Sequence, residues 1–251
     1  MEQTGRRPDA YRNEWKYAIS LPEAELLKRR LLPFMQPDPH VAGGQYTIRS
    51  LYFDDFWSSA YEEKLMGVEE RQKWRVRIYN YSGASIKLER KKKRGSYIHK
   101  DAASLTRAEF ERILAGDYGF LLGHAAPLCR EFYYESVARL QRPRVIVDYE
   151  RVPLIYPAGD VRITLDSGVR AASPGGNLFD PGLPTLAALE PGTLVLEVKF
   201  TEFLPGLIRR LLPPDGQQFI AVSKYTLCCE RVWHLTDPLA GIAKTNRRNM
   251  R

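Results

Sequence analysis

Apolar and charged residues alternate along several segments of the chain, and this alternation predicts β-strands. The clearest segments are residues 75–79, Arg-Val-Arg-Ile-Tyr, and residues 86–91, Ile-Lys-Leu-Glu-Arg-Lys. Successive side chains of a strand point to opposite faces of a sheet. Arg75 and Arg77 therefore share one face, and so do Lys87, Glu89 and Lys91. In any single strand, the solvated face of an ordinary antiparallel sheet gives the same pattern.

The alternation returns in four further segments, and this repetition favours a shared charged surface over a series of ordinary solvated faces. These segments are residues 12–16, 149–151, 161–166 and 195–199. If their charged faces converge on one interior, the chain builds a cationic cavity that contains a few carboxylates. Such a cavity suits a polyanion and its metal ion.

The pattern as a whole predicts an α+β fold. Strands are expected at residues 11–19, 46–53, 70–80, 84–91, 143–156, 160–170, 193–201 and 217–222. Helices are expected from the cap Ser20 to Pro33, from Asp54 or Asp55 to Met66, and at residues 104–114, 128–138, 204–212 and 224–234. Because closure removes exposed sheet edges, we expect a closed eight-stranded antiparallel β-barrel, or tunnel, with covering helices.

Length and composition favour one domain. The chain has 251 residues, of which 44% are hydrophobic, and this is enough to bury a core. We expect a disordered N-terminal tail over residues 1–10, a single domain over residues 11–236, and a basic C-terminal tail over residues 237–251.

The charge balance favours acidic partners. Lysine and arginine number 38 against 30 aspartate and glutamate, giving a formal net charge of +8. An excess of this kind attracts nucleic acids, phosphate compounds and anionic membranes. The three cysteines include an adjacent pair, Cys228 and Cys229, which fits neither a disulfide framework nor a zinc site. We therefore expect a reducing, cytoplasmic location, and no apolar run is long enough to span a membrane.

Common catalytic motifs are absent from the sequence. It contains no phosphate-binding GxxxxGK[ST] loop, no GxGxxG, no HExxH and no GxSxG. The four histidines are scattered and are expected to be surface or packing residues. Any phosphate chemistry therefore has to come from the charged strand faces.

Seven motifs, in this order, make the chain resemble the vacuolar transporter chaperone (VTC) domain. They are Arg12-Asn-Glu-Trp-Lys-Tyr17, Ile48-Arg-Ser-Leu-Tyr-Phe-Asp54, Arg75-Val-Arg77, Ile86-Lys-Leu-Glu-Arg90, Val145-Ile-Val-Asp-Tyr-Glu-Arg151, Leu196-Glu-Val-Lys199 and Ser223-Lys-Tyr225. This domain is part of the triphosphate tunnel metalloenzyme (CYTH-like) superfamily. The resemblance implies an eight-stranded tunnel and a polyphosphate polymerase that moves the γ-phosphate of ATP onto a growing polyphosphate chain with Mn²⁺ or Mg²⁺.

The resemblance also implies roles for individual residues. It implies a catalytic set of cations that act on the reacting phosphates: Arg75, Arg77, Lys87, Arg151 and Lys199. Further phosphate-binding positions are Lys16, Arg49, Lys91, Arg162 and Lys224. Glu197 is the principal expected metal ligand, with Glu89 or Glu14 nearby. Phosphoryl transfer depends mostly on positioning and charge neutralisation, so these residue types suit it.

Two departures from the wider superfamily shape the expected function. Its hydrolases carry Glu-x-Glu-x-Lys on the first strand, whereas this chain has Arg12-x-Glu14-x-Lys16. The cation favours the polymerase branch. Eukaryotic VTC proteins also carry a regulatory domain and membrane helices, which this sequence does not contain. We expect a bacterial-type stand-alone form, with a membrane protein as a separate partner if it has one.

Three functions remain open from the sequence. The first is the polymerase, acting on ATP and polyphosphate, and the second is a triphosphate phosphohydrolase of the same superfamily. The third is a non-catalytic polyanion-binding module, although no specific nucleic acid is expected. Glu197 and Lys199 could instead form a surface ion pair. The run Lys91-Lys-Lys-Arg94 is either a solvated basic turn or a second set of phosphate-binding cations at an opening.

Overall fold

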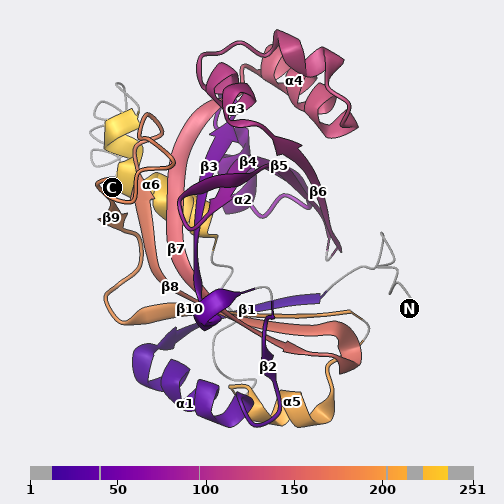
Figure 1. Ribbon diagram of the computed structural model, residues 1–251, viewed down its shortest axis with the longest axis vertical. Helices are drawn as coiled ribbons and strands as arrows, with labels where there is room; N and C mark the ends of the chain where they lie inside the picture. Colours follow the sequence, from indigo (N-terminus) through magenta and orange to yellow (C-terminus); the bar gives the residue numbers. More distant parts are fainter. Residues whose placement is uncertain (1–12, 40, 96, 202, 214–222, 237–251) are drawn as a thin grey trace.

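The computed structural model describes residues 13–236, apart from residues 40, 96, 202 and 214–222. It confirms the α+β class, with helices covering an antiparallel sheet (Figure 1). The strands are β1 (Asn13–Ser20), β2 (Gln36–Pro37), β3 (Tyr46–Asp54), β4 (Glu70–Tyr79), β5 (Ser82–Arg94), β6 (Tyr97–Leu105), β7 (Arg142–Tyr156), β8 (Val161–Ala172), β9 (Leu186–Ala187) and β10 (Thr193–Phe200). The helices are α1 (Leu21–Leu31), α2 (Ser59–Leu65), α3 (Arg107–Leu114), α4 (Pro127–Arg139), α5 (Gly206–Leu211) and α6 (Lys224–Thr236). Among these helices, none is long and apolar enough to cross a membrane.

Within the described residues the sheet is not closed, so the predicted closed eight-stranded barrel is not confirmed. Its order is β1-β10-β8-β7-β3-β4-β5-β6, with β2 paired to β7 and β9 to β8, which makes ten strands. Within the described residues, β1 and β6 form the two edges and do not pair with each other. An edge strand does not need closure to avoid pairing with another chain, because charged side chains on it also discourage such pairing. The edge strand β6 carries His99, Lys100 and Asp101.

The sheet nevertheless curves until its two halves face each other. Lys91 Nζ on β5 lies 3.0 Å from Glu14 Oε2 on β1, although five strands separate β5 from β1 in the sheet order. Register shifts interrupt three of the strand pairs, β3 with β7, β4 with β5, and β7 with β8, and such bulges bend strands. Figure 1 shows the curved β7 joining the upper half, β3 to β6, to the lower half with β1 and β10. We call the face that carries Glu14 and Lys91 the inner face.

Helices cover the outer face in two places. Beneath α3 and α4, Phe110 and Phe132 pack against Trp74 of β4 in one hydrophobic core. Beneath α1 and α5, Leu27 and Ile208 pack against strands β1, β8 and β10 in a second. These alternate apolar positions leave the charged positions of the same strands on the inner face.

The terminal helix α6 packs on the inner face instead. Tyr225, Cys228 and Val232 are buried against Ile48 of β3 and Val147 of β7. Tyr225 also donates a hydrogen bond to Asp54 Oδ2 at the end of β3. The first residue of the helix, Lys224, is therefore held over the charged part of the inner face.

Side-chain contacts confirm the predicted start of α1 after Ser20, whereas α2 begins later than predicted, at Ser59. Ser20 and Glu23 form a capping box at the start of α1. Before α2, Asp55 accepts from the Ser59 amide, and Asp54 accepts from the Ala60 and Tyr61 amides, although the N-cap residue itself is Ser58.

Two predictions between residues 91 and 114 are wrong. The basic turn expected over residues 91–97 is mostly strand, because β5 continues to Arg94 and β6, which pairs with it, begins at Tyr97. Strand β6 was not predicted, and it extends through residues 104 and 105, where a helix was expected. Helix α3 begins only at Arg107, after the Thr106 cap. The strand expected at residues 217–222 lies outside the described residues.

Candidate functional site

Glu197 of β10 lies at the centre of a group of cations on the inner face. Its carboxylate oxygens are 3.0 Å from Lys224 Nζ, 3.2 Å from Lys199 Nζ, 3.5 Å from Arg151 Nη2 and 3.8 Å from Lys16 Nζ. Only 5% of Glu197 is exposed. We name the connected charges the Glu197 cluster; its members are Glu14, Lys16, Lys91, Arg151, Asp166, Glu197, Lys199 and Lys224.

Strand pairing explains why these residues meet. Lys16 of β1 is directly opposite Glu197 of β10, and Glu14 is opposite Lys199. On the other side, Arg151 of β7 is opposite Asp166 of β8 and forms a bidentate ion pair with it, at 2.6 and 2.7 Å. Because paired residues point to the same face, alternation along four neighbouring strands produces one continuous charged surface.

Lysines also connect the two carboxylates of β1 and β10. Lys199 Nζ lies 3.3 Å from Glu14 Oε1, in addition to its contact with Glu197. Lys16 Nζ lies 3.6 Å from Glu14 Oε2. Lys91 reaches the same Glu14 from the opposite half of the sheet. Glu14 and Glu197 are therefore neighbours that share two lysines.

The surrounding cations keep the carboxylates ionised. Burial raises the pKa of Glu197, but Lys224, Lys199 and Lys16 outweigh it and hold the pKa well below its usual range. Burial likewise opposes ionisation of Glu14, whose pKa is lowered by Lys91, Lys16 and Lys199. Burial also opposes the charge on Lys224, yet Asp166 and Glu197 raise its pKa. The cluster thus holds five cations against three carboxylates, which leaves positive charge unmatched.

A second group of charges surrounds Glu89 on β5. Arg75 Nη2 lies 2.7 Å from Glu89 Oε2, Arg77 Nε lies 3.8 Å from it, and Lys100 of β6 contacts Oε1. Burial raises the pKa of Glu89, but Arg75, Arg77 and Lys100 lower it further than burial raises it. We name Arg75, Arg77, Glu89 and Lys100 the Glu89 cluster.

Tyr149 of β7 lies between the two clusters. Its hydroxyl accepts a hydrogen bond from Arg77 Nη2 at 3.5 Å. Its ring faces Arg151 at 5.3 Å and Lys224 at 4.9 Å, measured from the ring centroid. Burial raises the pKa of Tyr149, while Arg151 and Arg77 lower it, with a net decrease. The two clusters therefore form one site on the inner face.

The structure brings most of the sequence-predicted site residues into this site. Lys87 of β5 is opposite Arg77 of β4, and its Nζ donates to Ser104 Oγ at 2.6 Å. Arg162 of β8 is opposite Lys199, and its Nη2 lies 2.9 Å from Asp38 Oδ2. Both residues lie on the inner face at the margins of the two clusters.

Arg49 is the exception. It is opposite Ile78 of the outer core, so its side chain points to the outer face. It is 1% exposed and forms an ion pair with Asp148, Nη2 to Oδ2 2.6 Å. Its Nη1 donates to the carbonyl of Leu178. Arg49 therefore holds the sheet to the segment after β8 and is not part of the site.

Sequence reasoning missed Asp166, Lys100 and Tyr149. Asp166 and Tyr149 lie in segments whose alternation was recognised, so the same-face rule could have included both. Lys100 could not be found in this way because β6 was not recognised as a strand. Ser50 is a further contact, accepting from Arg77 Nε at 3.1 Å.

The donor chemistry of the Glu197 cluster fits a hard divalent cation only in part. Glu14 and Glu197 supply ionised oxygen ligands, the type that Mg²⁺ and Mn²⁺ prefer. Among the described residues, no group of three or more histidine, cysteine, aspartate or glutamate side chains is placed to hold a metal. A metal here therefore needs further oxygen ligands from a bound molecule. Glu89 is surrounded by three cations and makes no contact with these carboxylates.

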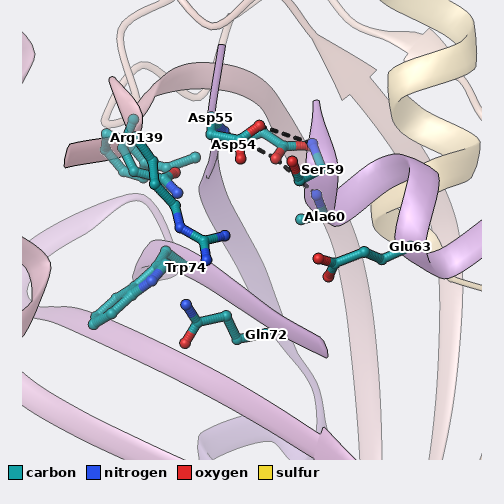
Figure 2. Close-up of a pocket in the computed structure, with 10 residues that line it drawn as sticks. Asp54, Asp55, Ser59, Ala60, Glu63, Gln72, Trp74 and Arg139 are labelled. Carbon is teal, nitrogen blue, oxygen red and sulfur yellow. Dashed lines mark hydrogen bonds between the residues drawn. The ribbon is translucent and has the colours of Figure 1, made fainter. Parts of the chain in front are cut away.

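A small pocket also lies outside this site, between the end of β3, α2, β4 and the end of α4. Figure 2 shows Glu63, Gln72 and Arg139 pointing into it. Asp54 and Asp55 also line it, but their oxygens accept the amides at the start of α2. The pocket contains none of the sequence-predicted site residues.

Comparison with known proteins identifies the family. A family model described as the VTC domain matches residues 11–233. A comparison with curated proteins finds no match.

Several solved structures are similar over most of the chain. A putative adenylyl cyclase from Hippeastrum, described as having a dominant triphosphatase activity, is 20% identical, with a TM-score of 0.49; the match covers 91% of this chain and 99% of that one. A putative adenylate cyclase from Bacillus halodurans is 12% identical, with a TM-score of 0.46 and coverage of 83% and 95%. A protein from Pyrococcus horikoshii is 12% identical, with a TM-score of 0.45 and coverage of 88% and 99%. Because the VTC model matches nearly the whole length, the chain belongs to the VTC domain family.

Proposed function

We propose that this chain is a metal-dependent polyphosphate polymerase that transfers the γ-phosphate of ATP to a growing polyphosphate chain. The observation that carries the proposal is the Glu197 cluster, where five cations from four strands and one helix surround three ionised carboxylates. Membership of the VTC family supports the choice of polyphosphate as product.

The cations perform the electrostatic part of the reaction. Phosphoryl transfer needs the phosphates to be held in line and their charge neutralised, and it requires no protein nucleophile. Arg75, Arg77 and Arg151 offer planar guanidinium forks that match phosphate oxygens, while Lys199 and Lys224 act as compact point charges. Four further cations neutralise phosphate charge in the same way towards the edges of the site: Lys16, Lys87, Lys91 and Arg162.

The carboxylates hold the metal ion. Mg²⁺ in phosphoryl-transfer sites is usually bound by one or two carboxylates and by substrate phosphates. Glu197 and Glu14 would provide these two ligands, and the remaining oxygen ligands would come from a bound phosphate compound. When bound, Mn²⁺ or Mg²⁺ neutralises phosphate charge and stabilises the leaving group. Glu89 orients Arg75 and Arg77 rather than binding the metal.

Substrate binding exchanges ion pairs within the cluster. Lys16 and Lys199 contact both Glu14 and Glu197 in the free protein. Phosphate oxygens replace the carboxylates as partners of these lysines, which frees the carboxylates for the metal. The partners of the protein are ATP and polyphosphate, with no specific nucleic acid. We place it in the cytoplasm, and any membrane protein partner is a separate chain.

The test is a product assay with the purified protein, ATP and Mn²⁺, measuring polymer and free phosphate together. The proposal expects polymer that depends on the metal and disappears with a chelator. Release of free phosphate alone replaces the polymerase with the triphosphate phosphohydrolase. Binding of polyphosphate without any turnover of ATP leaves only a polyanion-binding module.

A further inference from the structure

A group of cations continues the inner face beyond the two clusters. Arg71 and Lys73 precede Arg75 and Arg77 on β4 at every second position, so they share its face. Arg71 is opposite Lys93 of β5, and Lys73 is opposite Lys91. Lys64 of α2 completes the group, since α2 packs beside β4. We name Lys64, Arg71, Lys73 and Lys93 the basic rim.

Burial and neighbouring cations of the rim lower the pKa of Lys64, Lys73 and Lys93. Burial lowers the pKa of Lys64, and Arg71, Lys16 and Lys93 lower it further. The pKa of Lys93 is lowered first by burial and then by Arg71. Each effect requires the charges to be close in space. The basic rim therefore gathers residues from three elements into one cationic surface.

The rim contrasts with the two clusters because its acidic neighbours, Glu14 near Lys93 and Glu63 near Arg71, act on it only from a distance. In the described part of the chain, none of its four side chains has a carboxylate within ion-pair distance. Lys73 donates to Ser223 Oγ at 3.0 Å and lies 4.6 Å from the centroid of the Tyr225 ring. Arg71 donates to the Val68 carbonyl. Half-buried cations without close counter-ions are costly, and burial lowers the pKa of Lys73 to about 7, so it is partly deprotonated near neutral pH. A bound anion favours the charged form of these side chains.

The rim is also continuous with the proposed reaction site. Lys73 adjoins Lys91 across the strand pair and contacts Ser223, the residue before Lys224. From Arg77 to Arg71, β4 extends about 20 Å at roughly 3.3 Å per residue. A triphosphate is too short to contact both Arg71 and Arg77, whereas a longer phosphate chain can reach both.

We infer that the basic rim is a second polyanion site, which binds the part of a linear polyphosphate chain lying outside the reaction site. The inference rests on the proposed polyphosphate function. It differs from the sequence-based expectation for Lys91-Lys-Lys-Arg94, because alternation along β5 places Lys92 and Arg94 on the other face. The second set of cations therefore comes from three elements instead of one basic run.

The test compares binding of tripolyphosphate and of long-chain polyphosphate to two double variants. Arg71→Ala with Lys93→Ala removes a cross-strand pair from the rim. Lys92→Ala with Arg94→Ala is the matched control, since it removes the same charge from the outer face of the same strand region. Affinity is measured at several salt concentrations.

The inference expects the rim variant to lose about tenfold in affinity for the long chain, with a salt slope shallower by about 1.4, at roughly 0.7 per lost contact on a single-stranded polyanion. Its affinity for tripolyphosphate should stay within about twofold of wild type, because this short ligand fits within the reaction site and charges are largely screened beyond roughly 8 Å at physiological salt. The control should match wild type with both ligands.

The alternatives give different outcomes. If the rim variant binds long chains as tightly as wild type, the inference is overturned while the proposed function stands. If wild type binds neither phosphate ligand, the proposed function fails first. Tighter binding of single-stranded RNA than of polyphosphate overturns the choice of ligand. If the rim variant does not fold, Lys64→Ala with Lys93→Ala provides the same comparison.

Discussion

Burying the Glu197 carboxylate costs folding free energy, but a buried and ionised carboxylate suits catalysis. Removing a carboxylate and its cationic partners from water costs several kcal/mol per ion, and ion pairing in the interior often fails to recover this cost. A cluster with Glu14, Asp166, Glu197, Arg151 and Lys224 largely buried on one face therefore needs another explanation. Perturbed ionisable groups that gather in this way are typical of functional sites.

The substitution Glu197→Gln should remove metal-dependent turnover of ATP. The amide keeps the volume but loses the anionic oxygen, and such a ligand is worth several kcal/mol, or roughly a hundredfold in rate or more. Binding of tripolyphosphate without metal should persist, because four cations lose a competing carboxylate. Steady-state rates across a Mn²⁺ titration check this.

A matched glutamate provides the control for Glu197. Glu150 lies on β7 and forms a comparable ion pair with Arg170, Oε1 to Nη2 2.6 Å, outside the two clusters. Glu150→Gln should leave turnover unchanged. Equal rates for the two variants would show that Glu197 is not the metal ligand.

Lys73 should make the stability of the protein depend on pH. Burial lowers its pKa to about 7. Between pH 7 and about 10 the unfolded chain binds this proton and the folded chain does not, so the free energy of unfolding rises with pH. One proton contributes at most about 1.4 kcal/mol per pH unit. Stability from this residue is lost as the pH falls towards 7.

Replacing Lys73 by methionine isolates this effect. Lys91 and Lys100 also have a pKa lowered to about 8, so the wild-type profile contains several contributions. The difference between wild type and Lys73→Met should decrease steadily from pH 7 to pH 10, with the variant more stable at pH 7. Denaturant unfolding at each pH measures it. A difference that does not vary with pH would contradict the assignment.

At the scale of elements, strand β4 separates the two functions of the sheet. Trp74 and Val76 face the outer core, whereas Arg75 and Arg77 face the site. Replacing both arginines by glutamine should abolish measurable binding of ATP or tripolyphosphate. It should also lower the thermal midpoint, because Glu89 is 2% exposed and keeps only Lys100 as a partner.

An arginine on the outer face distinguishes lost binding from lost stability. Arg90 of β5 forms ion pairs with Asp101 and Glu131 and lies over the Trp74 ring. Arg90→Gln should lower the thermal midpoint without changing phosphate affinity. If it weakens phosphate binding as much as the β4 double variant does, the effect comes from stability and not from the site.

The sequence predicted the charged strand faces well because a period of two is a local property. Alternation alone therefore showed which charged residues of each strand share a face, among them Arg75 and Arg77. It did so without knowledge of the sheet order. It failed for Arg49, because the motif alone does not show that this position pairs with Ile78 and points to the outer face, and its partner Asp148 is 99 residues away. It missed β6, because charged residues on an edge strand resemble a solvated loop.

At the scale of the molecule, an ion pair joins the two halves of the curved sheet, where the described strands do not pair through their backbones. Lys91 and Glu14 connect its two halves, and α6 covers part of the inner face. The excess cations on the inner face repel one another, so a bound polyanion should stabilise the fold. The predicted closed barrel is not confirmed in the described residues, because the closure argument considered only backbone edges and not the charged side chains that protect them.

Tripolyphosphate should therefore raise the thermal midpoint. At a concentration of about 100 times its dissociation constant, the added stability is about 2.7 kcal/mol. For a protein of this size this corresponds to roughly 5–10 °C. Differential scanning calorimetry checks it, with sulfate at equal ionic strength as the control. An equal rise with sulfate would indicate a general salt effect and not binding at the site.

The central claim is that the inner face transfers phosphate from ATP to a phosphate chain. The most direct measurement uses γ-labelled ATP, Mn²⁺ and a polyphosphate primer of defined length, with the products separated by chain length. The account predicts label in chains longer than the primer by one or more phosphates, and loss of this label in Glu197→Gln. Label found only in free phosphate, with the primer unchanged in length, would contradict it.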